Sequence, residues 1–169
     1  MKTKVNENIY NIGVNDYDID LFEGQYILEN GMAYNSYIVL DNKIAVLDTV
    51  DKIAVDRWFD NLDALGDKKP DYLIVQHLEP DHSFGIQKFI EKYPDTVLYC
   101  SASALRMLPQ FCDVDLSKVV AVKEGDTLDL GTHKLNFVMA PMVHWPEVMV
   151  TYDSTDKVLF SADAFGKFG

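Results

Sequence analysis

Cysteine, basic side chains and long apolar runs are all scarce in this chain of 169 residues. The two cysteines, Cys100 and Cys112, form no Cys-x-x-Cys pair, so we interpret them as small core or boundary residues rather than as redox or zinc ligands. No apolar stretch approaches the ~20 residues that span a bilayer, and residues 1–11 contain no apolar segment of a signal peptide. These absences predict a cytoplasmic protein.

Basic residues are outnumbered, since the chain carries 15 lysines and arginines against 27 aspartates and glutamates, with a formal net charge of -12. A surface of this sign repels nucleic-acid phosphates and anionic lipids, and no basic run reverses it locally. We therefore expect no nucleic-acid partner and no membrane partner. Apolar residues make up 48% of the chain and charged residues 25%, a balance typical of a folded globular domain.

The hydrophobic pattern predicts strands first, then alternating strands and helices, then strands again. A hairpin is expected over residues 36–47, where Asp41-Asn42-Lys43 separates two β-branched runs. Residues 72–75 are wholly apolar, which indicates a strand buried on both faces. We expect further strands at residues 9–14, 25–28, 96–100, 119–122, 127–130, 134–138, 148–152 and 158–160, and helices at 55–65, 86–93 and 102–111.

This order of elements predicts an α+β fold in a single domain over residues 1–169, because no linker interrupts the pattern. The helices are expected to pack outside a mixed sheet. A generic doubly wound α/β domain is the alternative architecture. It would need more strand–helix alternation than the strand-rich final third of the chain offers.

The strongest local signal for chemistry is the run His77-Leu78-Glu79-Pro80-Asp81-His82, which directly follows the apolar strand. Near-extended backbone lets His77 and Glu79 point the same way, while Asp81 and His82 stand at the start of a helix. Taken singly, these side chains suit a helix cap, a solvated carboxylate and incidental histidines. Four potential ligands on one loop indicate a metal site instead. Imidazole and carboxylate without sulfur suit iron, manganese or catalytic zinc, and several carboxylates make a pair of divalent ions reasonable.

Two further candidates, His144 and Asp163, lie farther along the chain. His144 belongs to a loop shaped by two prolines, and Asp163 follows the strand expected at residues 158–160. Alone, His144 suits a structurally satisfied histidine and Asp163 a turn or cap residue. His133 falls at a hairpin turn beside Lys134, with no acidic partner that the sequence places within its reach, and we expect it at the surface.

Together these residues resemble a known family. The series His77-x-Glu79-x-Asp81-His82, followed by His144 and Asp163, is similar to the metallo-β-lactamase-like domain of flavodiiron proteins. In that comparison Glu79 stands where the hydrolytic relatives of the superfamily carry a histidine. Flanking segments are similar over essentially the whole chain: Glu23-Gly24, Gly31-Met32-Ala33-Tyr34-Asn35-Ser36-Tyr37, Leu47-Asp48-Thr49, Ala140-Pro141-Met142-Val143-His144-Trp145-Pro146 and Phe160-Ser161-Ala162-Asp163.

The resemblance implies the N-terminal portion of a metallo-β-lactamase-like αβ/βα sandwich that holds two non-haem iron ions. One iron would take His77, Glu79 and His144. The second would take Asp81, Asp163 would bridge the two, and the resemblance leaves open whether His82 ligates. No catalytic residue beyond the metal ligands is implied. The implied reactions are reduction of dioxygen to water or of nitric oxide to nitrous oxide, with electrons from FMN in a flavodoxin-like domain or from a donor such as rubredoxin.

The family's metal domain continues into a second half that supplies one more histidine, and a flavodoxin-like domain follows it. This sequence reaches Gly169 without either, so we expect a truncated domain with a weakened second iron site. We also expect little turnover by the chain alone, and association with itself as a homo-oligomer or with a C-terminal partner. Two alternatives stay open: a metal-dependent hydrolase of the metallo-β-lactamase superfamily, and a non-catalytic fragment or split subunit.

Overall fold

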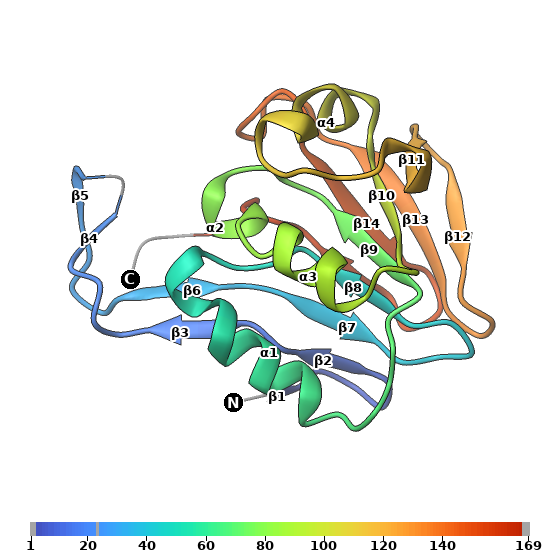
Figure 1. Ribbon diagram of the computed structural model, residues 1–169, viewed down its shortest axis with the longest axis horizontal. Helices are drawn as coiled ribbons and strands as arrows, with labels where there is room; N and C mark the ends of the chain where they lie inside the picture. Colours follow the sequence, from blue (N-terminus) through green and yellow to red (C-terminus); the bar gives the residue numbers. More distant parts are fainter. Residues whose placement is uncertain (1–2, 23, 167–169) are drawn as a thin grey trace.

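Helices cover one face of a large mixed sheet, and a smaller antiparallel sheet covers its other face (Figure 1). The computed structural model describes residues 3–22 and 24–166, so Glu23, part of one family-like segment, lies outside the described residues. The helices, the large sheet and the small sheet therefore form successive layers. This arrangement confirms the α+β class that the sequence pattern predicts.

The large sheet is antiparallel on one side and parallel on the other. In spatial order its strands are β1 (Thr3–Lys4), β2 (Ile9–Asn11), β7 (Tyr37–Val39), β8 (Ala45–Leu47), β9 (Tyr72–Val75), β10 (Val97–Ser101) and β11 (Val119–Val122). Neighbours from β1 to β8 pair antiparallel, and neighbours from β8 to β11 pair parallel. The β7–β8 pair is the hairpin that the sequence predicts.

Helical crossovers connect the parallel strands, as parallel pairing requires. The helices are η1 (Lys52–Ala54), α1 (Val55–Asp63), α2 (Pro80–Ser83), α3 (Ile86–Lys92), α4 (Ala102–Met107), η2 (Leu108–Gln110) and η3 (Leu116–Lys118). Trp58 of α1 and Phe89 of α3 are fully buried against the large sheet. Gly66 follows α1 with φ +92°, a conformation that favours glycine. Ser101 caps α4 by accepting a hydrogen bond from the N–H of Ala104 at 3.0 Å.

The second core lies between the two sheets. The small sheet consists of β12 (Thr127–Asp129), β13 (Lys134–Met139), β14 (Met149–Asp153) and β15 (Val158–Phe160). Because strand residues alternate between faces, β9 sends Leu73 and Val75 toward the helices and Ile74 toward the small sheet. Phe137 and Phe160 meet Ile74 in the same cluster. The apolar strand is thus buried on both faces, as predicted.

Two short ribbons extend the fold beside the sandwich (Figure 1). One pairs β3 (Val14–Asp16) with β6 (Met32–Tyr34), and the other pairs β4 (Leu21–Phe22) with β5 (Tyr26–Ile27). Both ribbons contribute side chains to the pocket described below. Within residues 3–22 and 24–166, no helix combines the length and apolar character needed to cross a membrane.

The two sheets are tied together where β9 ends. The Met149 N–H at the start of β14 donates a hydrogen bond of 3.1 Å to the carbonyl of Gln76, just beyond β9. This contact brings the loop between β13 and β14 next to the loop that follows β9. The candidate ligands of both loops therefore approach one another.

Candidate metal centre

The first candidate ligands follow the end of β9. Val75 is the last residue of this strand, and His77 lies in the loop that leads to α2. Glu79 is the N-cap of α2, and because Pro80 disfavours helical backbone before it, Glu79 has φ -55° and ψ 144°. The Oε2 atom of Glu79 lies 3.1 Å from His77 Nε2. The local sequence thus directs both side chains to one place.

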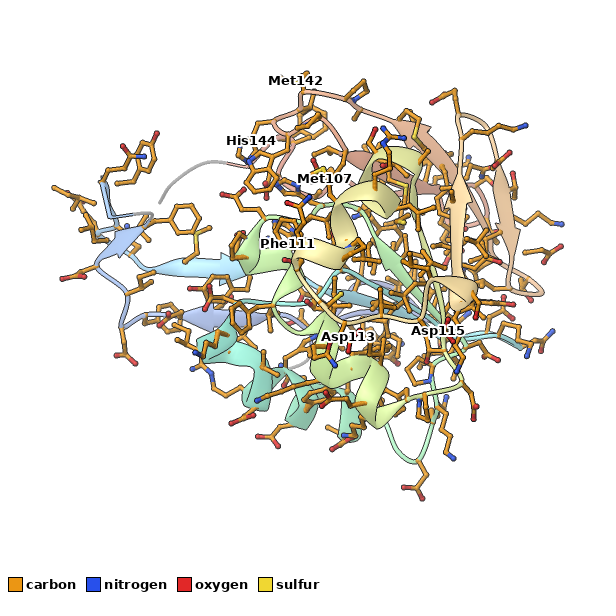
Figure 2. All side chains as sticks on the ribbon, turned by 45° about the horizontal axis from the view of Figure 1, so that its top comes forward. Met107, Phe111, Asp113, Asp115, Met142 and His144 are labelled. Carbon is orange, nitrogen blue, oxygen red and sulfur yellow. The ribbon has the colours of Figure 1, made fainter. Side chains whose placement is uncertain are left out.

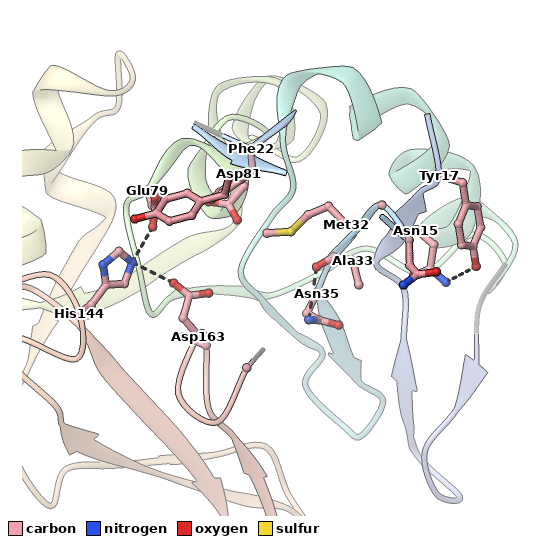
Figure 3. Close-up of a pocket in the computed structure, with 15 residues that line it drawn as sticks. Asn15, Tyr17, Phe22, Met32, Ala33, Asn35, Glu79, Asp81, His144 and Asp163 are labelled. Carbon is pink, nitrogen blue, oxygen red and sulfur yellow. Dashed lines mark hydrogen bonds and ion pairs between the residues drawn. The ribbon is translucent and has the colours of Figure 1, made fainter. Parts of the chain in front are cut away.

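A first group of potential ligand atoms surrounds Glu79. His144, from the loop between β13 and β14, places Nε2 2.8 Å from Glu79 Oε2. Asp163, from the loop after β15, places Oδ2 3.3 Å from His77 Nε2 and 3.4 Å from His144 Nε2. Figure 3 shows His144 between Glu79 and Asp163. Each of the four residues offers one ligand atom, and these atoms all lie within 4.8 Å of one another.

A second group shares Asp163. Its other oxygen, Oδ1, lies 2.7 Å from His82 Nε2, and Asp81 Oδ2 lies 3.7 Å from the same nitrogen. Asp81, His82 and Asp163 again offer ligand atoms within 4.8 Å of one another. The ring of His82 therefore points toward Asp163, a point that the sequence leaves open. Two groups on either side of one carboxylate could hold two adjacent cations.

Two buried carboxylates that the sequence interpretation missed contact the histidines from behind. Glu147 Oε1 lies 2.8 Å from His77 Nδ1. Asp48 Oδ2 lies 3.4 Å from His82 Nδ1, and Asp48 Oδ1 accepts a hydrogen bond of 2.7 Å from the Gln76 N–H. A signal was present for Asp48, which directly follows the apolar strand β8. Glu147 lies three residues beyond His144, in the same loop between β13 and β14 and directly after Pro146.

The carboxylates raise the affinity of both buried imidazoles for protons. Burial lowers the pKa of His77, but Asp163 and two neighbouring glutamates outweigh burial and raise this pKa to about 11. Burial likewise lowers the pKa of His82, and Asp163 with Asp48 raises it to about 10. Burial raises the pKa of Asp163, and hydrogen bonds from the two histidines lower it overall, well below its usual range. In the metal-free chain, protons on these rings balance the negative charge of the cluster.

The donor set fits iron. It combines imidazole nitrogens with carboxylate oxygens and contains no sulfur, a mixture suited to iron and manganese and found also at catalytic zinc. Among the described residues, Oδ1 of Asp81 is buried and has no hydrogen-bond partner. Burial raises the pKa of Asp81 to about 6, because the charged carboxylate is short of compensation there. A divalent cation would supply that compensation and displace the protons on the histidines.

A pocket of about 650 Å³ opens onto these groups. Its polar end is formed by Glu79, Asp81, His144 and Asp163 (Figure 3). Its other walls come from the short ribbons and include Tyr17, Phe22, Tyr26 and Met32. His144 has a side chain 57% exposed and lies near Met142 in one surface loop (Figure 2). A small molecule can therefore reach the candidate ligands from solvent.

The expectation that His133 lies at the surface was wrong. Only 1% of His133 is exposed, and its Nδ1 lies 2.8 Å from Oδ2 of Asp153. Sequence distance misled the interpretation, because Asp153 ends β14, the strand paired with β13 beside His133. Asp156 completes a third group of possible ligands with these two residues. However, Asp153 already accepts hydrogen bonds from the N–H groups of Thr155 and Asp156, as in an ordinary turn.

Comparison with known proteins places the fold in one class. The flavodiiron protein from Giardia intestinalis superposes with a TM-score of 0.93 at 27% identity, covering 99% of this chain and 41% of that one. Rubredoxin oxygen:oxidoreductase from Desulfovibrio gigas gives a TM-score of 0.86 at 31% identity, covering 94% of this chain and 40% of that one. The chain therefore has the fold of the metallo-β-lactamase-like domain of flavodiiron proteins.

The family follows from the sequence. The model of the family described as "ODP family beta lactamase" matches residues 32–169, and the chain belongs to this family. The anaerobic nitric oxide reductase flavorubredoxin of Vibrio vulnificus is 37% identical over 99% of this chain and 34% of its own length. The chain thus spans about a third of the length of this curated relative.

Proposed function

We propose that this chain is the metal-binding domain of a diiron oxidoreductase that reduces dioxygen to water, nitric oxide to nitrous oxide, or both. The observation that carries the proposal is the pair of ligand groups joined by Asp163. Relatives whose names include flavodiiron protein, nitric oxide reductase and oxygen oxidoreductase support it. We also propose that the protein is cytoplasmic.

The assignment of ligands follows the two groups. His77, Glu79 and His144 would hold the first iron. Asp81 and His82 would hold the second, and the two oxygens of Asp163 would face one iron each. The second group offers fewer donors, so we expect weaker binding there. We therefore propose that the two sites bind iron with unequal affinities.

Two reduced irons would supply electrons to a small oxidant bound beside them. The residues of this chain fix the donor atoms and shape the pocket by which the oxidant arrives. Reduction of dioxygen to two waters consumes four electrons and four protons. Reduction of two nitric oxide molecules to nitrous oxide and one water consumes two of each. The additional electrons for dioxygen must come from a donor, and we propose FMN in a flavodoxin-like domain or rubredoxin.

The hydrolase alternative is less well supported. A metal-bound hydroxide can be held by three imidazoles or by two imidazoles and one carboxylate, so the donor types alone suit both chemistries. Glu79 brings a carboxylate into the first group, with Oε2 within 3.1 Å of both His77 Nε2 and His144 Nε2. A carboxylate at this position lowers the net positive charge of the site. The preference for a redox iron rests instead on the relatives, whose names describe a nitric oxide reductase and an oxygen oxidoreductase.

A single-turnover experiment tests the function without a partner protein. The chain is loaded anaerobically with ferrous iron, freed of excess reductant and mixed with nitric oxide, and nitrous oxide is measured by gas chromatography. We expect one nitrous oxide for each pair of bound irons, and no hydrolysis of a lactam or thioester. Absence of nitrous oxide together with absence of iron oxidation by dioxygen would contradict the proposal. Rapid hydrolysis by the zinc-loaded chain would favour the alternative.

A further inference from the structure

Glu147 is a fully buried carboxylate whose contacts converge on one candidate ligand. Its side chain is 0% exposed. The Oε1 atom lies 2.8 Å from His77 Nδ1 and accepts a hydrogen bond of 3.0 Å from the N–H of Leu78. Both contacts are made by residues that follow β9, although Glu147 comes from the loop before β14. The side chain thus joins the two loops that carry the first ligand group.

The backbone holds Glu147 in place from the other side. The Ser101 hydroxyl donates a hydrogen bond of 2.7 Å to the Glu147 carbonyl. Two residues later, the Met149 N–H donates to the Gln76 carbonyl at 3.1 Å. Because these contacts anchor the main chain around Glu147, its carboxylate has little freedom to leave His77.

The opposite ring nitrogen of His77 faces the candidate metal position. His77 Nε2 lies 3.1 Å from Glu79 Oε2 and 3.3 Å from Asp163 Oδ2. A carboxylate beside Nδ1 keeps a hydrogen on that nitrogen, so a metal that displaces the second proton would bind the lone pair of Nε2. Histidine ligands in metal sites are commonly oriented in this way by an acceptor behind the ring.

We propose that Glu147 is a positioning residue that fixes the tautomer and ring orientation of His77 and increases its strength as a ligand for the first iron. This inference rests on the proposed function, because it assigns His77 to that iron. Glu147 itself would touch neither the iron nor the oxidant. It acts through the hydrogen bond to Nδ1.

A purely structural role for Glu147 explains fewer of the contacts made by its carboxylate. Accepting the Leu78 N–H needs only a neutral acceptor, whereas a buried charge is costly without compensation. Among the described residues, Oε2 of Glu147 is buried without a hydrogen-bond partner. Only Oε1 of this carboxylate therefore has partners. Of these, the His77 ring can carry a charge, whereas the Leu78 N–H is neutral.

The test uses cobalt(II) as a probe of the first site in the wild-type chain and in three variants. Glu147→Ala removes the acceptor, Glu147→Gln keeps an acceptor oxygen without the charge, and Ser101→Ala loosens the same loop while leaving the carboxylate in place. Affinity is measured by competition with a chelator. Proton NMR of the cobalt-loaded chain follows the exchangeable, metal-shifted N–H signal of His77, and circular dichroism follows folding.

We expect Glu147→Ala to lower the affinity of the tighter cobalt site by roughly 10–100-fold and to lose the N–H signal through exchange with water. Glu147→Gln should retain the signal and lose several-fold in affinity. Ser101→Ala should lower thermal stability and cost clearly less affinity than Glu147→Ala, because the carboxylate keeps its contact with His77. If Glu147→Ala does not fold, Glu147→Gln decides the matter.

Unchanged affinity in Glu147→Gln or in a folded Glu147→Ala would overturn the proposal. An equal loss in Ser101→Ala would also overturn it, because loop packing would then explain the effect. A wild-type chain that binds neither cobalt nor iron would overturn the proposed function and this inference together. Wild-type binding with unaffected variants would overturn this inference alone.

Discussion

Asp163 Oδ1 lies 2.7 Å from His82 Nε2, although the two residues are separated by 81 positions in the sequence. The second oxygen of the same carboxylate lies 3.3 Å from His77 Nε2. One side chain thus contacts a histidine of each ligand group. If two irons bind, Asp163 is the residue that couples them.

Asp163→Ala should therefore impair both sites rather than one. We expect the iron content after anaerobic loading to fall from two per chain to one or fewer, since the second group would keep only Asp81 and His82. Asp67, an exposed residue outside both groups, provides the matched control. Elemental analysis of Asp163→Ala and Asp67→Ala checks the prediction. Retention of two irons in Asp163→Ala would show that the carboxylate is not shared.

Substitution of His144 should weaken metal binding without affecting folding, and substitution of His133 should do the reverse. The His144 side chain is 57% exposed, so His144→Ala should change the free energy of unfolding by less than about 0.5 kcal/mol while weakening the first iron site at least roughly ten-fold. His133 is buried and bonded to Asp153, so His133→Ala should lower the free energy of unfolding by about 2 kcal/mol.

Urea denaturation and iron titration of both variants measure the two effects. Iron affinity in His133→Ala should match that of the wild type, because its group lies outside the two ligand groups around Asp163. A loss of iron binding in His133→Ala with an intact fold would contradict the assignment.

Both cysteines should resist labelling in the folded chain. Burial raises the pKa of the Cys100 thiol to about 12, and burial together with Asp113 raises that of Cys112 to about 11. Because the thiolate is the reactive form, maleimide or disulfide reagents at pH 8 should react slowly, and the rate should rise with pH. Labelling in denaturant, where both thiols are free, is the control. Fast stoichiometric labelling without denaturant would contradict the buried position of Cys100 and the half-buried position of Cys112.

The outer face of the small sheet is the surface on which we expect association. Alternation along β13 and β15 turns Val138 and Leu159 away from the core, and they are 39% and 47% exposed. Val138→Lys combined with Leu159→Lys should reduce self-association, because two charges would be buried in the contact. Sedimentation velocity at micromolar concentration compares the variant with the wild type. A wild-type chain that sediments as a monomer would contradict the expectation.

Local patterns predicted much of the fold. The β7–β8 hairpin and the buried strand β9 follow from turn residues and from an apolar run, and both signals lie within a few positions in the sequence. The run from His77 to His82 was equally visible, because a single loop carries it.

Such local patterns could not predict contacts between distant segments of the chain. Glu147 meets His77 across 70 positions, and Asp153 meets His133 through the pairing of β14 with β13. Nothing in the local sequence distinguishes these carboxylates from solvated ones. Only the packing of the two sheets places them beside a ring nitrogen, which is why Glu147 was missed and His133 was misplaced.

A ferrous iron titration of the purified chain under anaerobic conditions, followed by elemental analysis, tests the diiron centre most directly. We expect two irons per chain at saturation, one bound tightly by the group around Glu79 and the other more weakly on the far side of Asp163. Saturation at a single iron, or binding of zinc with exclusion of iron, would contradict the claim that these residues form a diiron centre.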